Sequence, residues 1–221
     1  RLAKEDGCLA VASLRAFLTP IPEPLHLLGH TISFHTGQQV DPVEAAEALA
    51  RLGYLRVPRV SVHGEFSSKG EVIDVFPFAG DAAVRMVLDF DRVTEIRHFD
   101  PISQGSIGHS EKVDISPVRE VLLDEERLNQ LRAVLPGEQL PEPFFEELLD
   151  AFARDPQHVG VEQYYPLCFA EQHSVIELIG ADGTLLLTDG ERLRAGFQVL
   201  RREVHELYRR AHRDGIFGPR P

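Results

Sequence analysis

The sequence is poor in the residue types on which small secreted proteins and membrane proteins depend. Of its 221 residues only Cys8 and Cys168 are cysteines, and tryptophan is absent. Two cysteines without a pairing pattern argue against a disulfide-stabilised secreted scaffold, so we expect a cytoplasmic protein. No run of about 18 apolar residues is present, and the sequence therefore predicts neither a membrane span nor a membrane partner.

Basic residues are also scarce, because the formal net charge is −12. Binding to the phosphate backbone of nucleic acids is built from clustered Lys and Arg, so this balance favours protein partners instead. The one basic stretch, VLRREVHELYRRAHRDG, has its arginines on the polar side of an amphipathic helix. Solvated side chains normally lie there, and we read them as such.

Several motifs of enzymes are missing. No G-x-x-x-x-G-K-[ST] loop is present to cradle phosphates, and the run VLLDEE places Asp124 where a helix N-cap is expected rather than a magnesium ligand. His26 and His30 have no third ligand at zinc spacing, and no G-x-S-x-G turn marks a nucleophile. The sequence therefore predicts no catalytic residue, metal or cofactor in this chain.

The beginning of the chain has neither an initiator Met nor the layout of a signal peptide, so we expect a piece of a longer protein. Its apolar run CLAVA predicts a buried strand, and SLRAFLTP predicts a short helix that stops at Pro20. The length allows one large domain or two ordinary ones, and two units are our starting expectation.

The middle of the chain changes from a helical to a β pattern. Asp41 and Pro42 form an N-cap and first turn, and the helix is expected over 41–52, with Gly53 ending it. The residues expected on its apolar face are Val43, Ala46, Leu49 and Ala50. Four β-segments follow and predict an antiparallel meander: YLRVPRVSVHGEF, GEVIDVFPF, AVRMVLDF and RVTEIRHFD.

Asp74 interrupts the apolar run of the second β-segment. Alternation along a strand puts Val72, Asp74 and Phe76 on one face. An unpaired carboxylate there would be costly, so we expect a hydrogen bond or ion pair with a backbone N–H or an arginine. This predicts a structural role for Asp74.

The last hundred residues begin with two polar helical stretches within 116–156 and then return to an α/β pattern. The segments VGVEQYYPLCF, SVIELI and TLLLTD precede a long helix. A short apolar strand followed at once by a helix is typical of a parallel sheet. The apolar face of that helix is expected to comprise Leu193, Phe197, Leu200, Val204, Leu207 and Ala211.

The stretch GEFSSKGEVIDVFP, together with VRMVLDF and EIRHFDP, resembles a region shared by the bacterial transcription-repair coupling factors and UvrB. HLLGHTISFHTGQQVD upstream and GVEQYYPLCF downstream are similar to the coupling factors. The resemblance implies an α/β (α+β) fold with mixed sheets, in which a helix and an antiparallel meander form a UvrB-interaction-type domain. That domain, residues 31–116, would be inserted in a partial RecA/UvrB-like α/β domain formed by residues 1–30 and 117–221.

The resemblance also implies a function. A coupling factor recruits the repair protein UvrA to RNA polymerase stalled at a lesion, and this module would bind UvrA without catalysis. ATP, magnesium, DNA and RNA polymerase would be bound by translocase and other domains outside these residues. The alternatives are a UvrB-type subunit of an excision nuclease, a surface that the remainder of the same polypeptide masks, and a small-molecule enzyme, which no constellation supports.

The UvrA contacts of the family map onto a basic residue before the motif glycine, an Arg in the third strand and an aromatic residue beyond it. These positions carry Lys69, Arg85 and Asp89, with Phe90 as the nearest ring and Arg97 as a further cation. We expect Lys69 and Arg85 to emerge from neighbouring strands. Lys lacks the planar fork of Arg, Asp89 is not aromatic, and Gly105 stands where relatives carry Arg, so we expect weaker UvrA binding or a co-adapted partner.

Overall fold

A computed structural model describes residues 9–23, 26, 29–134, 142–155, 158, 160–169, 171–179 and 183–213. The chain divides into two compact units: Leu25–Leu122, and Arg1–Pro24 together with Leu123–Pro221. The predicted assignment of 1–30, 31–116 and 117–221 to UvrB-like domains stays a prediction. Among the described helices, none combines the length and the apolar character that crossing a membrane requires.

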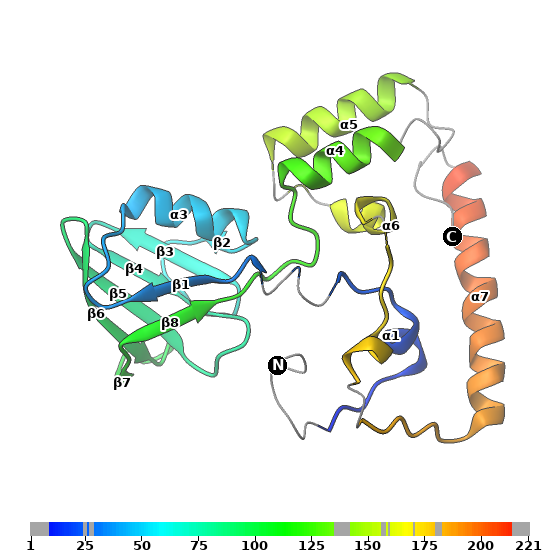
Figure 1. Ribbon diagram of the computed structural model, residues 1–221, viewed down its shortest axis with the longest axis horizontal. Coiled ribbons are helices and arrows are strands. Elements are labelled where there is room, and N and C mark those ends of the chain that lie inside the picture. Colours follow the sequence, from blue (N-terminus) through cyan, green and yellow to red (C-terminus); the bar gives the residue numbers. More distant parts are fainter. Residues whose placement is uncertain are drawn as a thin grey trace. The chain divides into compact units, whose positions relative to one another are not determined.

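The unit Leu25–Leu122 is built from one helix and two sheets (Figure 1). The helix is α3, Pro42–Arg51. A six-stranded sheet has the order β2-β3-β4-β5-β6-β7, and β1 pairs with β8 in a second, antiparallel sheet. The strands are β1 Ile32–His35, β2 Leu55–Arg56, β3 Glu65–Lys69, β4 Val72–Val75, β5 Ala83–Asp89, β6 Arg92–Phe99, β7 Ser106–His109 and β8 Lys112–Ile115.

The expected antiparallel meander is present from β3 to β7, where each strand pairs with the next. The mixed α/β fold class is thereby confirmed. The first β-segment, residues 54–66, departs from the predicted antiparallel meander. It contains the two-residue strand β2, which runs parallel to β3, and a connection between them. Pro58 lies in that connection, where it cannot donate to a strand ladder.

Helix α3 begins as the sequence predicts. The Asp41 carboxylate accepts hydrogen bonds from the backbone N–H groups of Val43 at 2.7 Å and Glu44 at 3.2 Å. Its buried residues are Ala45, Ala46 and Leu49. Val43 was wrongly expected on this face and is 66% exposed, because the buried stripe is centred on Ala45 and Leu49, about a third of a turn away.

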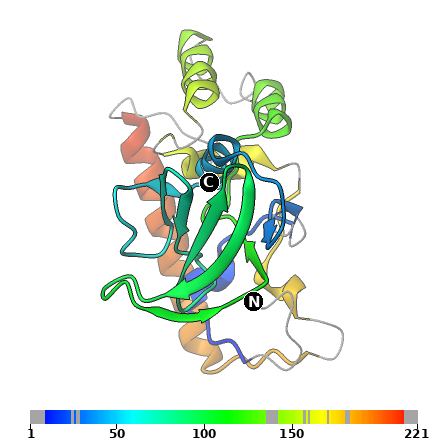
Figure 2. The same cartoon turned by 90° about the vertical axis from the view of Figure 1, so that its left-hand side faces the viewer.

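Helix α3 covers one face of the six-stranded sheet and leaves most of the other face open. The covered face forms the core with α3 through Phe66, Ile73, Val75, Val84, Met86, Leu88, Val93 and Ile96. Among the described residues of the opposite face, the buried ones include the polar Ser67 and a small apolar cluster, which consists of Val60, Phe76, Ala83 and Phe99. Figure 2 turns the sheet toward the viewer and shows its strands lying side by side. Within the described residues of this unit, no helix packs on that opposite face, and its charged side chains are partly exposed.

The other unit is helical in its described part. Its elements are α1 Leu14–Leu18, α4 Glu125–Val134, α5 Glu142–Arg154, the 3-10 helices η2 Val161–Tyr164 and η3 Val175–Leu178, α6 Tyr165–Cys168 and α7 Gly190–Arg213. The predicted short first helix and long last helix are confirmed. Asp124 is a helix cap, as predicted, because its carboxylate accepts the backbone N–H of Arg127 at 2.8 Å.

The two strands expected in CLAVA and TLLLTD are not observed, because described residues 9–13 and 183–189 form no strand. The segment VGVEQYYPLCF contains η2 and α6, and SVIELI contains η3. An extended apolar segment becomes a strand only when another strand pairs with it. Neither sheet in the described part of the chain includes these segments, so the predicted parallel sheet is not observed there.

Candidate protein-interaction site

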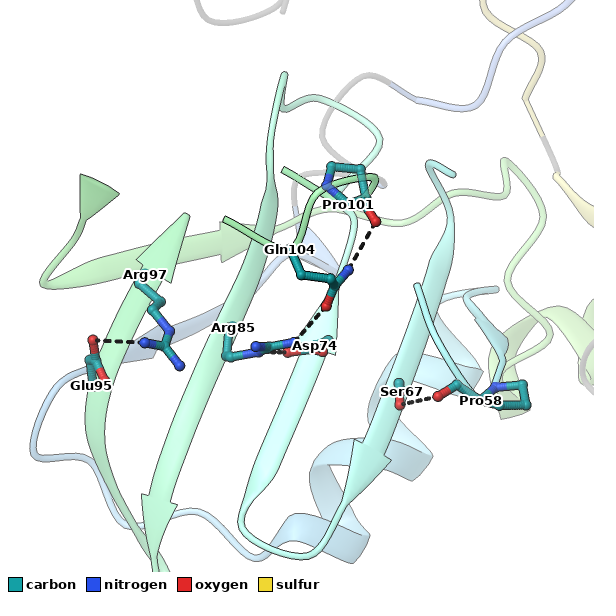
Figure 3. Close-up of polar contacts among 8 residues, drawn as sticks. All are labelled: Pro58, Ser67, Asp74, Arg85, Glu95, Arg97, Pro101 and Gln104. Carbon is teal, nitrogen blue, oxygen red and sulfur yellow. Dashed lines mark hydrogen bonds and ion pairs between the residues drawn. The ribbon is translucent and has the colours of Figure 1, made fainter. Parts of the chain in front are cut away.

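A row of polar side chains crosses the open face of the six-stranded sheet (Figure 3). The strand register aligns one residue from each of five consecutive strands, β3 to β7. Residues directly opposite each other in a sheet project from the same face, so the five side chains are neighbours. The row consists of Ser67, Asp74, Arg85, Arg97 and His109.

Arg85 lies at the centre of the row and is held by a two-pronged ion pair. Its Nε donates to Asp74 Oδ1 and its Nη2 donates to Asp74 Oδ2, each at 2.6 Å. The guanidinium carbon lies 4.7 Å from the centre of the Phe99 ring, a cation–π distance. The hydrogen bond with Asp74 raises the pKa of Arg85 above its ordinary value. The predicted pairing of Asp74 is confirmed, with an arginine as its partner.

A short loop after β6 brings a further side chain to Arg85. Gln104 Oε1 accepts a hydrogen bond from Arg85 Nη2 at 3.1 Å, and Gln104 Nε2 donates to the carbonyl of Pro101 at 2.9 Å (Figure 3). The Asp100 carboxylate accepts backbone N–H groups at both Ile102 and Ser103. Those bonds, with one from the Ser103 hydroxyl, lower the pKa of Asp100.

Gln104 was not predicted as a site residue. The sequence does contain the Asp-Pro pair that starts this turn, but it does not show that a side chain four residues later folds back on β5.

Arg97 stands directly opposite Arg85 on the neighbouring strand β6. Its Nη1 lies 3.9 Å from Glu95 Oε1, and the same oxygen lies 3.2 Å from His109 Nδ1. Like charges opposite each other in a sheet repel, so each arginine is compensated by one nearby carboxylate. The row therefore presents partly exposed cations on a protein whose net charge is strongly negative.

The other predicted site residues lie toward the ends of the strands. Lys69 is exposed at the end of β3, and Asp89 is exposed at the end of β5. Phe90 follows in the β5–β6 turn with a backbone φ of 56° and is 82% exposed. The structure therefore brings Arg85 and Arg97 together and places Lys69, Asp89 and Phe90 outside that pair.

The expectation that Lys69 and Arg85 lie on neighbouring strands is wrong. Strand β4 separates β3 from β5, because GEVIDVFPF forms the return arm of a hairpin with β3. Lys69 faces Val72, which in turn faces Val87. Lys69 thus shares the open face with Arg85 but lies two residues farther along the sheet.

This face of the sheet combines charged, polar and apolar groups. It offers a fixed guanidinium, a second arginine and polar groups around a small apolar cluster, a combination found in protein interfaces. Within the described ranges, no group of three or more His, Cys, Asp or Glu side chains could hold a metal ion.

Comparison with known proteins places this face in a recognised domain. Residues 32–120 match the UvrB interaction domain family. The chain is 35% identical over 144 residues to the transcription-repair-coupling factor of Myxococcus xanthus. The match covers 63% of this chain and 12% of that protein. The coupling factor of Borreliella burgdorferi is 26% identical over 167 residues. This match covers 74% of this chain and 14% of the length of that protein.

UvrB proteins also match the chain. The UvrABC system protein B of Thermotoga petrophila is 33% identical over 99 residues, covering 45% of this chain and 15% of that protein. The chain thus spans less than a fifth of the length of each of these three relatives. Residues 32–120 thus match the UvrB interaction domain family, and the predicted similarity of the chain to the bacterial transcription-repair coupling factors is confirmed.

Proposed function

We propose that this chain is the UvrA-binding module of a transcription-repair coupling factor. The observation that carries the proposal is the charged row on the open sheet face of a UvrB interaction domain. In the cytoplasm, the longer protein would recruit UvrA to RNA polymerase that is stalled at a lesion. ATP-driven movement on DNA and contact with the polymerase would belong to other parts of that protein, and the residues described above would bind without catalysing a reaction.

Within the proposed interface, Arg85 is the central contact and Arg97 lies beside it. Arginine is enriched among the few interface residues that dominate the binding energy. A guanidinium that is already held in place loses little conformational freedom on binding. Lys69, Asp89 and Phe90 would form the outer contacts at the ends of the hairpins. An exposed cation at such a rim contributes more to the association rate than to affinity.

Titration of the chain with UvrA tests the proposal. We expect Arg85→Ala to weaken binding by about 1 to 3 kcal/mol, the range for a lost hydrogen bond to a charged group. Arg97→Ala and Lys69→Ala should have smaller effects. The double variant Asp74→Asn/Arg85→Gln leaves no uncompensated charge and should also lose affinity, whereas binding equal to wild type in both Arg85 variants would refute the site.

The extent of the similarity favours a coupling factor over UvrB as the source of this module. The matches to the Escherichia coli and Borreliella burgdorferi coupling factors extend over 178 and 167 residues, against 128 residues for the Thermosipho africanus UvrB. We include in the proposal that the remainder of the longer polypeptide masks the same face. Tighter UvrA binding by this chain than by the complete protein would support masking, and equal affinities would contradict it.

A further inference from the structure

Gln104 joins the central arginine of the open face to the loop beside it. Its amide is used at both ends, because Oε1 accepts from Arg85 Nη2 at 3.1 Å and Nε2 donates to the Pro101 carbonyl at 2.9 Å. The second bond fixes which end of the amide faces Arg85. Together with the Asp74 carboxylate and the Phe99 ring, Gln104 therefore restrains the guanidinium from a third side.

The backbone of Gln104 has a conformation that side chains normally avoid. Its φ is 62°, in the left-handed region, where a residue with a Cβ costs roughly 1 to 2 kcal/mol. The loop holds it there through hydrogen bonds from Gln104 N to the Asp100 carbonyl at 2.7 Å and from Asp100 N to the Gly105 carbonyl at 2.9 Å. Arg59 Nη2 also donates to the Ile102 carbonyl at 3.0 Å.

A strained residue that its surroundings hold in place is a reason to look for a role at a functional site. A glycine would meet the backbone requirement without strain, so the benefit of Gln104 must come from its side chain. The contact of that side chain with the open face is the hydrogen bond to Arg85.

We propose that Gln104 is a positioning residue, which orients the Arg85 guanidinium so that its Nη1 group meets an acceptor oxygen of the partner. Nη1 takes part in neither the Asp74 bonds nor the Gln104 bond, and the Arg85 side chain is 22% exposed. A partner carboxylate is the matching acceptor for a guanidinium. Holding the fork before binding removes part of the entropy cost of ordering it in the complex. This inference rests on the proposed UvrA-binding function.

The variant Gln104→Gly separates positioning from folding. It removes the amide but suits the φ of 62°, so the melting temperature should be unchanged or higher. UvrA affinity should nevertheless fall about three- to tenfold, as expected when a charge-assisted hydrogen bond no longer orders the contact. Gln104→Glu keeps an acceptor for Arg85 Nη2 but loses the donor to the Pro101 carbonyl, so its affinity should lie between those of wild type and Gln104→Gly.

A readout without UvrA tests the same inference. Rotation of the Arg85 guanidinium about its Nε–Cζ bond, followed by ¹⁵N NMR of the free chain, should be faster in Gln104→Gly than in wild type. Wild-type rotation or wild-type UvrA affinity in Gln104→Gly would overturn the positioning role. If Arg85→Ala still weakens UvrA binding in that case, the proposed UvrA-binding function is retained and only the positioning role of Gln104 is rejected. Full UvrA binding by Arg85→Ala would contradict both proposals.

Discussion

Cys168 illustrates how burial decides the chemistry of a single residue. The residue is fully buried, and its carbonyl accepts a hydrogen bond from Arg127 Nη1 at 3.0 Å. Burial raises the pKa of the Cys168 thiol to about 12, although the positive charge of Arg127 opposes this shift. The thiolate is the reactive form of cysteine, so Cys168 should be chemically inert in the folded protein.

We therefore predict that Cys168 in a Cys8→Ser background does not react with a disulfide reagent at about pH 8 until the protein is unfolded. Relative to the ordinary thiol pKa of 9.0, a pKa of about 12 means roughly a thousandfold fewer thiolates in the folded state. Thiol release measured by absorbance, with and without guanidinium, checks this. Rapid modification without denaturant would show that this unit opens readily.

For Asp74, the sequence could predict that the carboxylate is paired but not which residue is its partner. Alternation along β4 showed that the carboxylate shares a face with apolar neighbours and needs a partner. Which partner it finds depends on the register of β4 against β5, and the connection between these strands determines that register. Gln104 was missed for a similar reason, because its contact with Arg85 depends on how a loop folds back onto the sheet.

At the scale of elements, helix α3 depends on the glycine that ends it. Gly53 has a φ of 92°, and a Cβ there would lie 2.8 Å from Arg119 Cγ and 3.0 Å from Val118 Cγ2. The backbone N–H of Gly53 donates to the Ala50 carbonyl at 2.9 Å and so closes the last turn. A side chain at this position would meet both backbone strain and crowding.

We predict that Gly53→Ala lowers the free energy of unfolding by about 2 to 3 kcal/mol, through left-handed strain and overpacking together. The matched control is Gly70→Ala, where φ is 58° and a Cβ would meet open space, so only the strain remains. Urea unfolding of both variants separates the two contributions. Equal losses at the two positions would show that crowding at Gly53 costs nothing.

The 3-10 helix η3 is stabilised by a pair that should respond to pH. His173 Nδ1 lies 2.5 Å from Glu177 Oε2, and Glu177 Oε1 accepts the backbone N–H of Ser174 at 2.8 Å. The hydrogen bond to Glu177 raises the pKa of His173 above 6.5, with smaller contributions from the charges of Glu177, Glu171 and Glu23. The same bond, with that from Ser174, lowers the pKa of Glu177 below 4.5.

The signs of these shifts define a pH window. The His173 contribution is fully present below pH 6.5 and is lost as the pH rises through the raised pKa. The Glu177 contribution is present above pH 4.5 and is lost as the pH falls through the lowered pKa. The stability difference between wild type and Glu177→Gln should therefore be largest between about pH 4.5 and 6.5. A difference that does not shrink by about pH 8.5 in urea titrations would contradict the pairing.

The elements that the sequence predicted well are those with local signals. Asp41, Pro42 and Gly53 bound α3, and the apolar period of the last helix marks α7. Strands were harder to predict, because an extended segment needs a partner that is distant in sequence. Residues 183–189 have a strand-like composition without a described partner, while β2 pairs in parallel through a short connection that local patterns do not show.

At the scale of the whole molecule, the chain consists of a sheet unit with an open charged face and a second, mainly helical unit. The resemblance seen in the sequence agrees with the match of residues 32–120 to the UvrB interaction domain family, because short motifs in the right order indicate a family even where local structure is ambiguous. It could not show the arrangement of the face. The central arginine is held in place by Asp74 and Gln104 and does not project freely, so its proposed binding role would depend on the fixed orientation of its guanidinium.

The central claim, that UvrA docks on the open sheet face, is tested most directly by the UvrA affinities of Arg85→Ala and Arg51→Ala. Both variants remove one positive charge, but Arg51 lies on α3, across the sheet from Arg85, and makes an exposed pair with Glu47 at 3.6 Å. The account predicts a loss of about 1 to 3 kcal/mol in binding free energy for Arg85→Ala and no significant loss for Arg51→Ala. Equal affinities of the two variants for UvrA would contradict it.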